Sequence, residues 1–197
     1  MASRLQSRTE RERKGNNLLI KGAKNLNVIK WYRKKIEVKL EENCREILKI
    51  IEQLIKRTKS GKDVDSQVFF TKMIADYNRY MCEFVDGDKR DHYVQTASDQ
   101  YEAALKMSES LNPCSPLRLG IELNMSVFQY EIKNDTKTAI LIAHDSYDKI
   151  EKQLQTLQNA GDEYNDAATI MQLLYENLNM WNKELQEQQG TGDKNDY

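Results

Sequence analysis

Three separated segments carry polar side chains set into otherwise apolar helical patterns, and they are the parts of this chain best suited to chemistry. Their sequences are DYNRYMCE at residues 76–83, PLRLGIELNMSVFQYEI at residues 116–132 and IMQLLYENLNMW at residues 170–181. The first places an arginine beside a tyrosine, the second an asparagine two turns before a glutamate, and the third an asparagine one turn before a tryptophan. If the three faces turned toward one another, they would line a groove able to hold an extended phosphorylated peptide.

Arg79 has charged neighbours that suit anion binding. Lys72 lies two turns before it on the same helix face, and Asp76 and Glu83 lie at i−3 and i+4, within reach of ion pairs. Such charges usually form a solvated surface, because exposed ion pairs contribute little to the stability of the fold. Beside Tyr80, however, an arginine held by carboxylates would offer a fixed fork of donors to a dianionic phosphate.

The helix expected to begin at Pro116 has two apolar stripes, although a single core contact needs only one. The stripes are Ile121, Met125, Phe128 and Ile132 on one side and Leu119, Leu123, Val127 and Tyr130 on the other. A helix buried on all sides would explain this pattern if it stood alone. Asn124 and Glu131, however, share one face beside Leu123 and Val127, so we interpret that face as a ligand-facing wall.

The composition favours long amphipathic helices and therefore an all-α fold. The chain has 197 residues, of which 39% are hydrophobic and 31% charged, with only 8 Gly and 2 Pro to interrupt it. Apolar spacing and breakers predict helices at residues 28–56, 65–85, 92–111, 116–134, 136–158 and 164–185. Gly15 and Gly22 predict a linker at residues 15–27, and the polar residues 186–197 predict a disordered tail. A solenoid of tetratricopeptide type is the alternative architecture, but no period of about 34 residues is sustained.

No constellation of residues points to an enzyme, a metal or a cofactor. Cys44, Cys82 and Cys114 show neither CxxC spacing nor an even count, which disfavours a disulfide framework or a zinc site. His92 and His144 lie in different predicted helices, and no Gly-rich phosphate loop is present. No run approaches the roughly 20 apolar residues that a membrane span needs. We therefore expect a soluble protein of a reducing compartment, the cytoplasm.

The charge is distributed unevenly along the chain. Residues 1–62 hold 18 Lys and Arg against 7 acids, whereas residues 63–197 hold 12 against 24. A basic arm can indicate nucleic-acid binding, but no aromatic platform for base stacking accompanies these charges. We expect no nucleic-acid partner, and a steep salt dependence of binding to RNA or DNA would contradict this expectation.

In order and spacing, the three segments resemble the signature segments of 14-3-3 proteins. The resemblance extends from YRKKIE at residues 32–37 to Trp181. It implies an antiparallel array of helices that binds phosphoserine or phosphothreonine segments of client proteins without catalysis. In the 14-3-3 family, as in SH2 domains, arginine clusters capture the phosphorylated motif.

The same resemblance implies a role for each matching residue. Arg79 and Tyr80 fall on the family's phosphate ligands, and Lys72 falls on a lysine of the same groove. The residues that match the ligands of the peptide backbone are Asn124 and Asn177, with Glu131 closing their network. The residues that match the apolar groove wall are Leu123, Val127, Ile170, Leu173 and Trp181.

The N-terminal part departs from the family pattern. Residues 3–10 resemble the last turns of the family's third helix, and the first two helices, which build the family's dimer, have no counterpart before them. We therefore expect a remnant helix and linker at residues 1–27, a helical domain at 28–185 and a tail at 186–197. We also expect a monomer or an atypical weak dimer, with phosphopeptide binding weakened by the missing basic residues of the third helix. The alternative function is a helical interaction scaffold that does not depend on phosphate.

Overall fold

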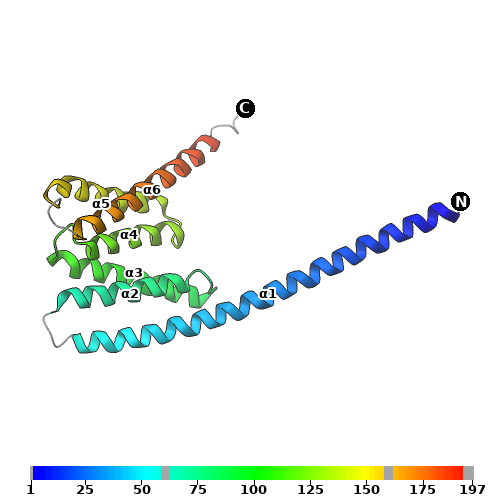
Figure 1. Ribbon diagram of the computed structural model, residues 1–197, viewed down its shortest axis with the longest axis horizontal. Helices are drawn as coiled ribbons and strands as arrows, with labels where there is room; N and C mark the ends of the chain where they lie inside the picture. The colour runs from blue at the N-terminus through cyan, green and yellow to red at the C-terminus, as the bar shows by residue number, and fades with distance from the viewer. Residues whose placement is uncertain (1, 59–62, 158–161, 193–197) are drawn as a thin grey trace. The chain divides into compact units, whose positions relative to one another are not determined.

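The computed structural model describes the backbone of residues 2–58, 63–157 and 162–192 and the side chains of residues 25–58, 63–153 and 164–187 (Figure 1). Its helices are α1 (Ala2–Thr58), α2 (Val64–Met81), α3 (Asp88–Met107), the short 3-10 helix η1 (Ser108–Ser110), α4 (Pro116–Glu131), α5 (Thr136–Leu157) and α6 (Asp162–Gly192). The described residues contain no strand, and the all-α prediction is confirmed. The chain divides into two units, Met1–Arg45 and Glu46–Tyr197. No helix in the described ranges is long and apolar enough to cross a membrane.

Two predicted interruptions of the helices are wrong. α1 continues through Gly15 and Gly22, where the sequence predicted a linker. A single glycine costs a helix interior only about 1 kcal/mol relative to alanine, and the Leu and Lys residues between these two glycines are good helix formers. α6 continues to Gly192, into the predicted tail, because residues 184–189 are Glu, Leu and Gln, which also favour helix. The last residues of that tail, 193–197, lie outside the described residues.

Local signals define the ends of the shorter helices. The carboxylate of Asp63 caps α2 by accepting a hydrogen bond of 3.1 Å from the backbone N–H of Ser66. Pro116 occupies the first turn of α4, as the sequence predicted, since the amide that proline lacks would have had no helical partner. α4 ends at Glu131, three residues earlier than predicted, and Asn134 then turns the chain with φ of 55°.

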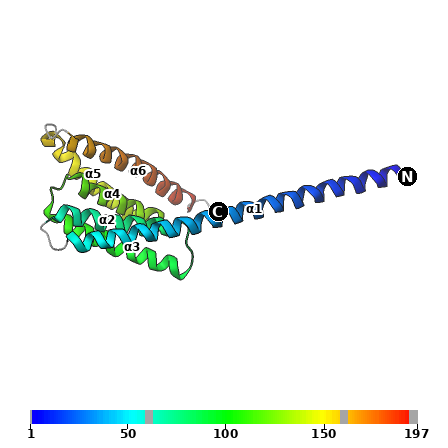
Figure 2. The same ribbon diagram turned by 60° about the horizontal axis from the view of Figure 1, so that its bottom comes forward.

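Within the unit Glu46–Tyr197, α4 lies between the α2–α3 pair and the α5–α6 pair (Figures 1 and 2). One buried cluster joins α4, α5 and α6, and its members are Cys114, Leu119, Ala139, Ala143, Ile150, Ala167, Leu174, Leu178 and Trp181. On the other side of α4, Phe128 contacts Tyr101 of α3 with ring centroids 5.6 Å apart. Because α4 touches both α2 and α6, the three candidate segments come from neighbouring helices.

Candidate functional site

A buried carboxylate on α2, Asp76, connects three helices at the centre of the candidate site. Its Oδ2 accepts a hydrogen bond of 2.7 Å from Lys72 Nζ, one turn earlier on α2. Its Oδ1 accepts hydrogen bonds of 2.6 Å from the Tyr101 hydroxyl of α3 and 2.8 Å from Asn124 Nδ2 of α4. These three donors compensate the cost of burying the charge. The sequence places Asp76 within reach of an ion pair with Arg79, but among the described ion pairs its partner is Lys72.

Tyr101 was not predicted as part of the site, although it completes this network. Burial and the neighbouring charge of Asp76 raise the pKa of Tyr101 far above its ordinary value, so its hydroxyl remains a neutral donor. Tyr101 and Asn124 are separated from Asp76 by 25 and 48 residues. Only the i, i+4 spacing of Lys72 and Asp76 could have indicated part of this network from the sequence.

Arg79 is the buried cation of the site, with 9% of its surface exposed. Its Nη1 lies 3.5 Å from Glu131 Oε2 and 3.7 Å from Glu83 Oε1, and both carboxylates are about half-exposed. Its Nε is buried and has no hydrogen-bond partner among the described residues. Burial lowers the pKa of Arg79, but Tyr101, Tyr80 and Asp76 raise it by more, so the guanidinium stays charged. Arg79 therefore has an N–H donor, at Nε, that its contacts with Glu131, Glu83 and the Tyr101 hydroxyl do not use.

Tyr80 lies beside this guanidinium on the surface of α2. The Cζ atom of Arg79 is 4.6 Å from the centroid of the Tyr80 ring, and this cation–π contact orients both side chains. The Tyr80 ring also meets the edge of Tyr77 at 5.8 Å. Tyr80 is exposed, and its hydroxyl makes no hydrogen bond within the described part of the chain. It is available to a ligand bound at Arg79.

The two asparagines differ in their surroundings. Asn124 donates its amide to Asp76, which leaves its carbonyl oxygen free to accept. Asn177 of α6 is partly buried and forms no side-chain hydrogen bond with the residues that the structure describes. Both amides can therefore still bind an extended peptide backbone.

The predicted apolar wall is only partly at the surface. Leu123, Val127 and Ile170 are partly buried against the cluster between α4, α5 and α6, and Leu173 is exposed. Trp181, by contrast, is only 1% exposed and lies inside that cluster. Its ring stacks on the Tyr130 ring with centroids 5.0 Å apart, so Tyr130 covers it. The structure thus places Trp181 in the core, where it supports the wall from behind.

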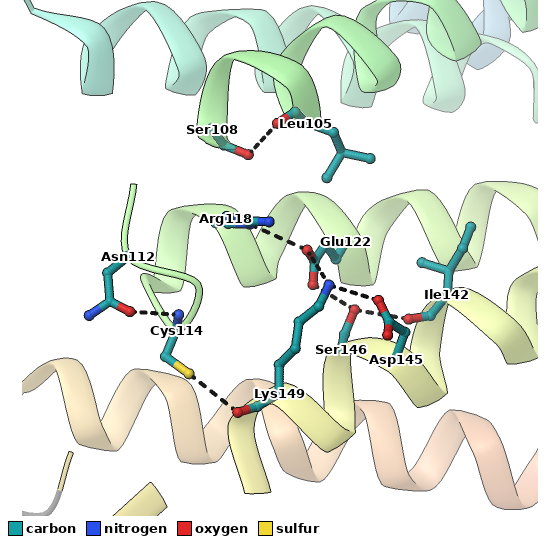
Figure 3. Close-up of polar contacts among 10 residues, drawn as sticks. All are labelled: Leu105, Ser108, Asn112, Cys114, Arg118, Glu122, Ile142, Asp145, Ser146 and Lys149. Carbon is teal, nitrogen blue, oxygen red and sulfur yellow. Dashed lines mark hydrogen bonds and ion pairs between the residues drawn. The ribbon is translucent and has the colours of Figure 1, made fainter. Parts of the chain in front are cut away.

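A buried charge network fixes α4 to α5 (Figure 3). The carboxylate of Glu122 on α4 accepts hydrogen bonds of 2.7 Å from the Ser146 hydroxyl and 3.2 Å from Lys149 Nζ, both on α5. Arg118, one turn earlier on α4, lies 3.5 Å from the same carboxylate. With Glu122 bound to α5 and Asn124 bound to Asp76, α4 is held on two sides, and this arrangement sets the direction of the face that carries Asn124.

A polar cleft of about 550 Å³ lies at the ends of α2 and α4, beside Arg79. Its charged lining consists of Glu83, Asp86, Glu131 and Arg90. Arg90 donates to the backbone carbonyls of Cys82 at 3.2 Å and Ile132 at 3.3 Å, so it joins the two helix ends. Three carboxylates make this cleft unsuitable for an anion. No group of His, Cys, Asp and Glu in the described ranges is arranged to hold a metal ion.

Comparison with known proteins identifies relatives along most of the chain. The family description "14-3-3 protein" matches residues 2–182. The chain is 38% identical over 159 residues to 14-3-3 protein eta of Homo sapiens, an alignment covering 80% of this chain and 64% of that protein. It is 40% identical over 154 residues to 14-3-3 protein 2 of Entamoeba histolytica, which covers 78% of this chain and 63% of that protein. The chain therefore spans slightly less than two thirds of the length of these relatives.

Proposed function

The chain belongs to the 14-3-3 family, and from this premise we propose that it is a cytoplasmic, non-enzymatic adaptor that binds phosphoserine or phosphothreonine segments of client proteins. In this proposal the peptide lies along the faces of α2, α4 and α6. Arg79 and Tyr80 bind the phosphate, and Lys72 lines the same groove. Asn124, Asn177 and Glu131 contact the peptide backbone, and Leu123, Val127, Ile170 and Leu173 form the apolar wall.

The state of Arg79 is the observation that carries the proposal. A guanidinium that is nine-tenths buried normally forms short hydrogen bonds with carboxylates, yet Arg79 lies 3.5 and 3.7 Å from its two carboxylates, hydrogen-bonds otherwise to the Tyr101 hydroxyl, and has a buried Nε without a partner among the described residues. A phosphate carries a charge of about −1.5 to −2 at neutral pH and accepts several charge-assisted bonds. Since Glu83 and Glu131 are half-exposed, a dianion can displace them into water at little cost.

The described charges also predict that this binding is modest. Lys72 and Arg79 are the two cations of the site, and Asp76, Glu83 and Glu131 are the carboxylates around them. The site therefore has one more carboxylate than it has cations, and a bound phosphate must overcome the repulsion from this excess negative charge. The same balance favours the second candidate function, a helical scaffold that binds partners without phosphate, because Arg79 is already partly neutralised.

One titration distinguishes the two functions. A fluorescent phosphoserine peptide and its unphosphorylated form are titrated with the wild-type protein, Arg79→Glu and Lys106→Glu. Each charged hydrogen bond contributes about 1.5 to 3 kcal/mol, so phosphate should strengthen wild-type binding by about tenfold or more. Arg79→Glu should remove this difference with helix content unchanged by circular dichroism. Lys106 is exposed on α3 and serves as the matched control, which should behave as wild type. Equal affinity of the wild type for both peptides would favour the scaffold.

A further inference from the structure

A tyrosine-lined cavity lies between α5 and α6, away from the candidate site. It has a volume of about 270 Å³ and is lined by Tyr147 of α5 and by Tyr164, Ala168, Met171, Gln172 and Tyr175 of α6. Successive residues of an α-helix are turned by about 100°. The lining residues therefore occupy the face of α6 nearly opposite to Ile170, Leu173 and Asn177. A ligand could fill this cavity while a peptide occupies the proposed groove.

The rings of this cavity are held in place but remain accessible. Tyr147 and Tyr164 pack partly against the cluster between α4, α5 and α6, whereas Tyr175 is half-exposed. The centroids of Tyr147 and Tyr175 are 6.3 Å apart, with their planes inclined at 35°. None of the three hydroxyls has a hydrogen-bond partner among the described residues. The small side chain of Ala168 leaves the space between the rings open.

The charge around the cavity is negative. From Asp162 to Asn182, α6 contains four acidic residues and no Lys or Arg. Gln172, in the cavity wall, donates a hydrogen bond of 2.8 Å to Glu176, which holds that carboxylate beside Tyr175. On α5, Lys149 is already bound to Glu122 and Asp145. The faces of aromatic rings attract cations, and the acidic surroundings add to this attraction.

We propose that this cavity binds the lysine or arginine side chain of a basic segment on a partner protein. The ring faces would contact the cation, and the free hydroxyls and the Gln172 carbonyl oxygen would accept its hydrogen bonds. The negative potential of α6 selects a basic partner over an acidic one. Binding at this cavity does not involve phosphate, so a test of the cavity neither supports nor contradicts the function proposed above.

The experiment uses two small probes that differ in charge but hardly in shape. N-acetyl-arginine amide and N-acetyl-citrulline amide are titrated into the full chain, and the ring resonances of its tyrosines are followed by NMR. We expect saturable shifts of Tyr147, Tyr164 and Tyr175 with the arginine probe, and binding of the citrulline probe weaker by about threefold or more. Absence of saturable shifts, or equal binding of the two probes, would overturn the proposal.

Variants at Tyr175 keep the test specific. Tyr175→Phe preserves a ring face and should retain discrimination between the probes, whereas Tyr175→Ala should lose it. Because Tyr175 is half-exposed, both variants should fold, which circular dichroism checks. Met180→Ala removes an exposed apolar side chain of α6 that does not line the cavity and is the matched control. If folded Tyr175→Ala still discriminates between the probes, the cation binds elsewhere and the assignment is wrong.

Discussion

Asn124 Nδ2 donates a hydrogen bond of 2.8 Å to Asp76 Oδ1, and this contact joins α4 to α2 at the centre of the candidate site. The same carboxylate accepts from Lys72, so it orients two of the proposed peptide-binding side chains at once. Because Asp76 is buried, water does not compete for these bonds. The relationship gives Asp76 a positioning role in the proposed groove.

Replacing Asp76 by Ala should weaken phosphopeptide binding by about tenfold or more, since Asn124 and Lys72 would lose their common acceptor. The free energy of unfolding should fall by about 1 to 3 kcal/mol, because the buried Tyr101 hydroxyl would lose the acceptor of its hydrogen bond. Fluorescence anisotropy and urea unfolding measure the two effects. Asp99→Ala, which removes an exposed carboxylate that accepts from Gln95, is the control. Unchanged affinity in a folded Asp76→Ala protein would refute the positioning role.

The fold followed from local patterns that the sequence displays directly. The apolar spacing and Pro116 correctly predicted α4, and α4, which carries Asn124, packs against both α2 and α6, which carry Arg79 and Asn177. The break expected from Gly15 and Gly22 was wrong because a glycine weakens a helix without necessarily ending it.

The connections between helices could not be predicted in the same way. An ion pair between Asp76 and Arg79 was expected because both lie on one helix. Two of the partners that Asp76 has in the structure, Tyr101 and Asn124, come instead from α3 and α4. Such pairings depend on how whole helices pack, which periodicity within one helix does not report. The burial of Trp181 behind Tyr130 has the same origin, since a tryptophan on an apolar stripe can face either a groove or the core.

Replacing Lys149 alone should lower the free energy of unfolding by more than replacing both Lys149 and Glu122. The Glu122 side chain is 6% exposed and that of Lys149 31%, so Lys149→Ala leaves a buried carboxylate with fewer partners. Loss of one partner of a fully buried pair costs about 3 to 5 kcal/mol, and the exposure of Lys149 reduces the expected loss to about 2 kcal/mol.

A double-mutant cycle with Glu122→Gln, followed by urea unfolding, measures the coupling directly. The double variant should be more stable than the sum of the single effects predicts, by about 1 kcal/mol or more. Lys137→Ala, which alters an exposed lysine of α5, should leave stability within about 0.5 kcal/mol of wild type. Additive single effects would show that Glu122 and Lys149 do not stabilise each other.

Cys82 should be an unreactive thiol despite its proximity to Arg79. Burial raises its pKa from 9.0 to about 11, and the nearby Arg90 and Arg79 only partly oppose this shift. Native Cys82 should therefore react with iodoacetamide at pH 8 about a hundredfold more slowly than in urea, because its thiolate fraction is lower. Mass spectrometry of the labelled peptides separates Cys82 from the other two cysteines. Equal rates in the native and unfolded protein would contradict the shift.

The same shift predicts a pH dependence of stability. The folded state holds the Cys82 proton more tightly than the unfolded state, so this contribution is fully present below pH 9 and is lost as pH rises toward 11. In urea unfolding at pH 8, 9, 10 and 11, wild type should lose more stability than Cys82→Ala over this interval. Parallel curves for the two proteins would mean that Cys82 titrates equally in both states.

Two glycines should respond to alanine substitution in opposite directions. Gly87, before α3, has φ of 64° and ψ of −151°, a conformation that is essentially restricted to glycine, and a Cβ there would meet no atom within 4 Å. Gly87→Ala should therefore lose about 1 to 3 kcal/mol through backbone strain alone. Gly120 lies inside α4, and a Cβ there would reach Lys72 Cε at 3.6 Å, an ordinary contact, so Gly120→Ala should gain about 0.5 to 1 kcal/mol. Thermal unfolding followed by circular dichroism compares both variants with wild type. A stable Gly87→Ala protein would show that the chain relaxes this turn without strain, and a destabilised Gly120→Ala protein would show that α4 cannot accept a methyl group beside Lys72.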